Sequence, residues 1–146
     1  MTQTASETVS ASWQTLMDAL DGIPEERMTE RGAAGDWSVK DLLGHIAFWE
    51  SRAVAHLNRQ VSNEPQPDDD GDGDVDFEAI NVEQHALREN QPLGDARAEM
   101  EQTHEQLVAL LTRIPDVSPE EIKGNTFGHY AEHTQDILAW RERAGI

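Results

Sequence analysis

Apolar residues along the chain recur at steps of three and four residues, which is the spacing of an amphipathic helix. In the first such segment, from Ser6 to Leu20, one face carries Trp13, Leu16, Met17 and Leu20. A second segment runs from Ser38 to Gln60, and the pair Ser38 and Asp41 at its start resembles a capping box. No segment alternates strictly between apolar and polar residues, so we expect an all-α protein.

The stretch Ser62–Asp76 breaks the helical pattern, because it is rich in aspartate, proline and glycine. We expect a long mobile acidic loop there. Within it, the spacing of Asp68, Asp70, Asp72 and Gly73 matches the opening of a calcium-binding loop. The twelfth position is Ala79 where such a loop needs glutamate, so we favour an acidic loop over a calcium site.

The second half of the chain predicts two more long helices. A short helix over Phe77–Glu89 leads into a longer one over Gly94–Ile114, with Asn90-Gln91-Pro92 between them. After a loop bracketed by Pro115 and Pro119, a last helix is expected over Thr126–Arg143. Four long helices, the third of them split, predict a four-helix bundle that forms a single domain over residues 1–146.

Charge and composition narrow the choice of partners. The 146 residues carry 29 acidic side chains against 11 Lys and Arg, for a net charge of −18, and no cysteine. Such a negative field repels phosphate backbones and anionic lipids, so we expect neither nucleic acid nor membrane as a partner. A strongly solvated surface explains the charge more simply than recruitment of a cationic partner. The first residues lack the pattern of a signal peptide, and we expect a cytoplasmic protein without membrane spans.

The candidate chemistry lies in three histidines. His129 and His133 are one helical turn apart, which places both imidazoles on the same face of the last helix. His45 lies in the most apolar stretch of the chain, where a buried imidazole needs hydrogen-bond partners or a metal ion. Three inward histidines from two helices would form a facial ligand set with open positions for a substrate.

The other histidines fit this site less well. His56 returns to the face of His45 about 16 Å further along the helix, too far to bind the same ion. His85 and His104 have no partner at ligand spacing, and His104 is expected to be a polar core residue or a support for a ligand. The run from His129 to His133 also spells H-x-x-E-H, an inverted zinc-peptidase pattern. Those enzymes draw another ligand from far downstream, whereas this sequence ends at Ile146, so we do not favour a peptidase.

Two segments resemble the signatures of the DinB-like superfamily, which includes DinB, YfiT and ClbS–DfsB types. The first is Trp37–Glu50, with its Trp-Ser-x-x-Asp-Leu-x-x-His block, and the second is Gly128–His133 followed by Ile137 and Trp140. The resemblance implies a bundle with helices running up-down-down-up, and a metal, often nickel or zinc, bound by His45, His129 and His133. It also implies a homodimer, and relatives that are thiol-dependent isomerases and transferases or, in the neighbouring ClbS–DfsB branch, a hydrolase. The acidic stretch over residues 62–76 departs from the usual compact family pattern.

Two functional hypotheses follow. In the first, the protein is a metal-dependent enzyme in which a nickel, zinc or iron ion activates water or a low-molecular-weight thiol against a small electrophile. Glu132 is a weak candidate for assisting that nucleophile, and the candidate substrate contacts are Trp49, Arg52, Asn81, Tyr130 and Trp140. In the second, the same cleft binds or sequesters a metal or a damaging small molecule without catalysis.

Overall fold

The computed structural model describes residues 3–67 and 76–146. The calcium-loop candidate over 68–73 therefore lies outside the described residues. Where the chain is described it is all helical, with no β-strand, as the apolar pattern predicted. None of the helices in these ranges is long and apolar enough to span a membrane.

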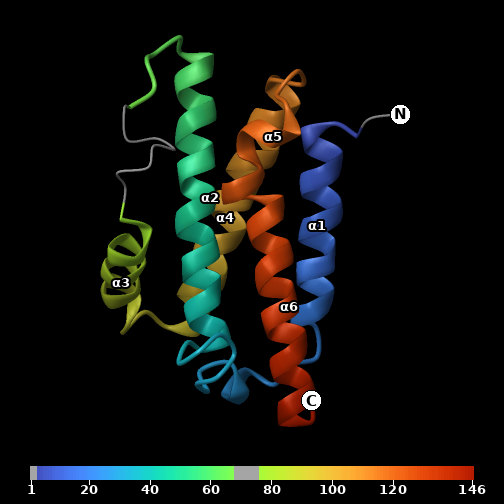
Figure 1. Ribbon diagram of the computed structural model, residues 1–146, viewed down its shortest axis with the longest axis vertical. Helices are drawn as coiled ribbons and strands as arrows, with labels where there is room; N and C mark the ends of the chain where they lie inside the picture. The colour runs from blue at the N-terminus through green and yellow to red at the C-terminus, as the bar shows by residue number, and fades with distance from the viewer. Residues whose placement is uncertain (1–2, 68–75) are drawn as a thin grey trace.

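The bundle is formed by α1 (Ala5–Leu20), α2 (Val39–Val61), α4 (Leu93–Arg113) and α6 (Phe127–Ala144). These bounds agree with the expected helices to within one residue at every end. Figure 1 shows α1 and α6 running in one direction and α2 and α4 in the other, which is the expected up-down-down-up order. The main contacts pair α2 with α4 and α1 with α6.

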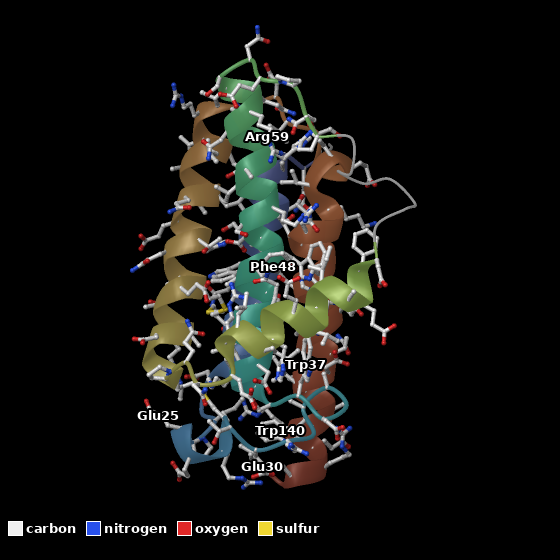
Figure 2. The ribbon with its side chains drawn as sticks, turned by 90° about the vertical axis from the view of Figure 1, so that its left-hand side faces the viewer. Glu25, Glu30, Trp37, Phe48, Arg59 and Trp140 are labelled. Carbon is white, nitrogen blue, oxygen red and sulfur yellow. The ribbon has the colours of Figure 1, made fainter. Side chains whose placement is uncertain are left out.

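The parallel pair of α2 and α4 requires a long return connection between their ends. The short helix α3 (Phe77–Arg88) belongs to that connection and packs on the outer side of α2. Figure 2 shows α3 lying obliquely across α2, between the levels of Phe48 and Trp37. It is therefore not a collinear lead-in to α4, because the turn at Asn90-Gln91-Pro92 changes the direction of the chain.

Local sequence explains why α2 begins where it does. The Ser38 hydroxyl accepts from the Asp41 amide at 3.1 Å, and the Asp41 carboxylate accepts from the Ser38 amide at 2.9 Å. The predicted capping box is thus confirmed, with aspartate in the usual place of glutamate. This cap fixes the first turn of α2 and hence the direction in which His45 points, two turns later.

The core is made of aliphatic side chains contributed by all four long helices. Representative fully buried residues are Leu16, Leu43, Ile46, Leu107 and Ile137. The loop expected after Pro115 contains a short helix, α5 (Pro119–Ile122), and a 3₁₀ turn over Lys123–Asn125. Proline at the first position of α5 suits the start of a helix, because its missing N–H is not needed there.

Candidate metal centre

Three imidazole rings meet between α2 and α6. The Nε2 atom of His129 lies 2.9 Å from Nε2 of His45 and 2.9 Å from Nε2 of His133. The three potential ligand atoms all lie within 4.8 Å of one another. The structure therefore brings together the three histidines that the sequence singled out, although His45 and His129 are 84 residues apart.

The start of α6 fixes the position of His129. A side chain on the preceding Gly128 would place its Cβ 2.9 Å from the backbone carbonyl oxygen of Lys123. Only glycine accepts such a close approach of two backbone segments. Because α6 can begin this close to the preceding 3₁₀ turn, its first two turns present His129 and His133 toward α2.

Groups behind the rings orient two of the three histidines. His133 is buried, and its Nδ1 lies 3.0 Å from the Asp136 carboxylate, on the side of the ring away from the cluster. A carboxylate at this nitrogen holds the tautomer that leaves Nε2 free to bind a metal. The ring of His45 packs with its edge against Trp37, with centroids 4.9 Å apart.

Burial keeps two of the imidazoles neutral. Loss of solvent, assisted by the neighbouring His133, lowers the pKa of His45 to about 4. The same causes, with a further contribution from His45, lower the pKa of His129 to about 3. A neutral imidazole is the form that binds a metal ion, so protons compete weakly for these two rings at neutral pH.

The donor set fits a divalent transition metal. Two nitrogens that bind one ion at about 2.0–2.1 Å lie roughly 2.9 Å apart when the angle at the ion is a right angle. Both observed nitrogen separations have this value. In addition, the Nδ1 atom of His129 is buried and has no hydrogen-bond partner among the described residues. That leaves Nε2, which faces the other rings, as the nitrogen available for a ligand bond.

The histidines open into a cleft of about 630 Å³, which is the size of a small-molecule site. Its walls carry aromatic rings and a few polar groups: Trp37, Trp49, Phe77, Asn81, Asn125, Glu132 and Asp136. Trp49 and Asn81, two of the candidate substrate contacts, lie here, and the Trp49 indole donates to the Asn81 side-chain oxygen at 2.7 Å. Glu132 is exposed at the same cleft.

The structure does not bring Tyr130 and Trp140 to the cleft. Tyr130 is fully buried, and its hydroxyl donates to the Glu50 carboxylate inside the core. Burial, together with the charge of Glu50, raises the pKa of Tyr130, so the phenol keeps its proton. Trp140 is also buried and lies near the end of the bundle that carries Glu25 and Glu30 (Figure 2). Both residues support the core on faces of α6 that do not open into the cleft.

Sequence reasoning missed Glu50, a carboxylate that is only 1 % exposed. Its Oε1 lies 3.3 Å from Nδ1 of His104, and the His104 ring stacks on Trp13 at 3.6 Å. His104 is therefore a polar core residue, one of the two roles expected for it, and it is not beside the metal ligands. A signal for Glu50 was present in the sequence, since its spacing places this acid on the same helix face as the apolar residues Ile46, Ala53 and Leu57.

The remaining histidines lie outside the cluster, as expected. His56 faces Glu121 at 3.0 Å and lines a hollow next to the cleft. His85 stacks on Trp37 and lies 3.2 Å from the Asp41 carboxylate. These contacts attach α3 and α5 to the side of α2.

Comparison with known proteins agrees with this architecture. The model of the DinB superfamily matches residues 8–140, and the chain belongs to that superfamily. The family resemblance carried by the Trp37–Glu50 and Gly128–His133 segments is thus confirmed. A search of curated proteins finds no match.

Two solved structures show a similar fold. One is an uncharacterised protein from Escherichia coli UTI89, with a TM-score of 0.81 and 17% sequence identity over 100% of this chain and 97% of the other. The second is the colibactin self-resistance protein ClbS in complex with a double-stranded DNA, with a TM-score of 0.72 and 16% identity over 91% of this chain and 90% of that one. At these identities the likeness shows the fold alone.

Proposed function

We propose that this protein is a metal-dependent enzyme that acts on a small electrophilic compound inside the cleft. The observation that carries the proposal is the convergence of His45, His129 and His133 at the wall of a cleft of about 630 Å³. A nickel, zinc or iron ion held by these rings would supply a Lewis acid that lowers the pKa of a coordinated water or thiol.

The residues of the chain have distinct roles in this proposal. Trp49 and Phe77 pack edge to face at 5.6 Å and form an apolar wall that excludes water from the bound compound. Asn81 fixes the Trp49 ring through its hydrogen bond. Glu132, exposed in the cleft one residue before His133, is the candidate proton acceptor for a water or thiol nucleophile.

Metal content tests the site directly. Protein purified without an affinity tag is expected to contain close to one equivalent of nickel, zinc or iron by elemental analysis. His45→Ala should abolish the metal content, because the variant keeps only two of the three imidazoles. The matched control is His56→Ala on the same helix, which should retain the metal because His56 faces Glu121 instead of the cluster. Equal metal content in the two variants would contradict the proposal.

Catalysis is tested separately from metal binding. The metal-loaded protein is incubated with a thiol and a panel of epoxides, activated alkenes and strained rings, and product is counted per protein molecule. Many turnovers that disappear in His45→Ala support an enzyme. Consumption that stops at one equivalent rejects catalysis for that panel and favours the alternative, a protein that sequesters its ligand. The homodimer expected from the family resemblance remains a prediction, which static light scattering tests.

A further inference from the structure

A second hollow lies beside the cleft along α2. This hollow has a volume of about 280 Å³ and is lined by Arg52, Ala53 and His56 among others. Trp49, Phe77, Gly124 and Asn125 line both the hollow and the cleft, so the two spaces are neighbours. Arg52 follows His45 by two turns of α2, which separates them by about 10 Å along the helix axis.

Among the residues that the structure describes, Arg52 is a cation without an acidic partner. Its guanidinium lies over the Trp49 ring, 5.4 Å from the centroid, and forms no ion pair with a carboxylate of residues 3–67 or 76–146. By contrast, Arg27 pairs with Glu30 and Arg88 pairs with Glu99. A partly buried guanidinium held on an aromatic face retains N–H donors for a planar anion.

The acidic residue in the described lining of the hollow already has partners. Glu121 lines the same hollow, but its Oε1 faces Nε2 of His56 at 3.0 Å and also accepts from the Gln60 amide. The remaining lining is apolar or neutral. Together with the net charge of −18, the nearby Glu121 disfavours a dianionic phosphate more than a carboxylate with a single charge.

We propose that Arg52 is an anion-binding subsite beside the cleft and that the substrate carries a carboxylate remote from its reacting group, at roughly the 10 Å that separates Arg52 from His45 along α2. This proposal rests on the proposed function, since the three histidines define the reacting end. The middle of such a compound is apolar or aromatic, because Trp49 and Phe77 line the space between the two ends.

A pair of probes that differ only in charge tests this subsite. The first is 4-(2-carboxyethyl)benzohydroxamic acid, which has a metal-binding hydroxamate at one end and a carboxylate at the other. The second is its primary carboxamide. Both are titrated into zinc-loaded protein by calorimetry, and the ratio of the two affinities is measured for each variant.

Wild-type protein is expected to bind the carboxylate at least tenfold more tightly than the carboxamide. Arg52→Gln should reduce the ratio to within twofold while leaving the carboxamide affinity unchanged, and Arg52→Lys should retain part of the preference. The matched control is Arg59→Gln, since Arg59 lies two turns further along α2 and donates to Gln66. A ratio below twofold in wild type, or one unchanged in Arg52→Gln, overturns the proposal.

A second titration separates this subsite from the metal. 4-Phenylbutyrate and 4-phenylbutyramide lack a metal-binding group, and their binding to metal-free protein is followed by NMR. A preference for the carboxylate that depends on Arg52 supports the subsite even if elemental analysis finds no metal and the proposed function fails. If metal content is normal but neither pair of probes shows that dependence, the subsite fails and the metal site stands.

Discussion

The buried hydrogen bond from Tyr130 to Glu50 connects α6 to α2, the two helices that carry the three converging histidines. Tyr130→Phe removes only the hydroxyl, so the ring still fills its place and little cavity forms. What is lost is a hydrogen bond to a charged group, worth about 1.5–3 kcal/mol, and the carboxylate stays in the core. We expect the free energy of unfolding to fall by about 2 kcal/mol, which lowers the melting temperature by roughly 6 °C.

The measurement is urea and thermal unfolding of metal-free protein followed by circular dichroism. Glu50→Gln keeps an acceptor for the hydroxyl and should cost less than Tyr130→Phe. The double variant supplies a coupling energy, expected to be at least about 1 kcal/mol for two groups in direct contact. Glu101→Gln removes an exposed carboxylate on α4 and is the control, expected within about 0.5 kcal/mol of wild type. If Tyr130→Phe behaves like this control, the bond does not stabilise the bundle.

Four further predictions follow from the site and the charge. Asp136→Asn should weaken zinc binding by about 10–100-fold, measured by competition with a chelator, because it removes the carboxylate at Nδ1 of His133; unchanged affinity would refute that role. Gly128→Ala should lower the free energy of unfolding, measured in urea, by about 1–3 kcal/mol, since the new Cβ would lie 2.9 Å from a backbone oxygen. A variant as stable as wild type would mean that the backbone shifts at no cost. Metal-free protein should lose stability as the pH falls from 6.5 toward 4, because His45 and His129 become protonated in the unfolded chain but, with their lowered pKa values, stay neutral in the folded protein. If the free energy of unfolding of His45→Gln depends on pH in the same way as that of wild type, this reasoning is wrong. Fluorescence anisotropy with labelled duplex DNA at low salt should show no binding, given the charge of −18; micromolar affinity would overturn that expectation.

The apolar pattern was sufficient to predict the bundle and the convergence of the three histidines. Helix positions depend on local periodicity and caps, so the long helices and the Ser38 cap could be predicted from neighbouring residues. The three histidines that could hold a metal could be predicted for a similar reason. His129 and His133 share a helix face by spacing alone, and His45 lies on the buried stripe of a helix that must pack against the others.

The position of α3, in the connection between α2 and α4, was harder to predict. The sequence predicts a helix over Phe77–Glu89, and the structure has it over Phe77–Arg88, yet the direction of that helix depends on contacts with distant residues. Its position across α2 is maintained by Asn81 with Trp49, and by His85 with Trp37. A break at proline marks the end of a helix but does not set the angle of the next one.

The sequence by itself determined the helical class, the limits of the main helices and the identity of the three converging histidines, because these follow from the periodicity of side chains along each helix. Only the tertiary structure decided which polar residues of α2 and α6 face the cleft and which face the core. Tyr130 and Glu50 bond to each other inside the bundle, whereas Asp136 and Arg52 are at the open side. The physical reason is that helical spacing fixes the angle between side chains on one helix, while the packing of the neighbouring helices fixes which of those angles is buried.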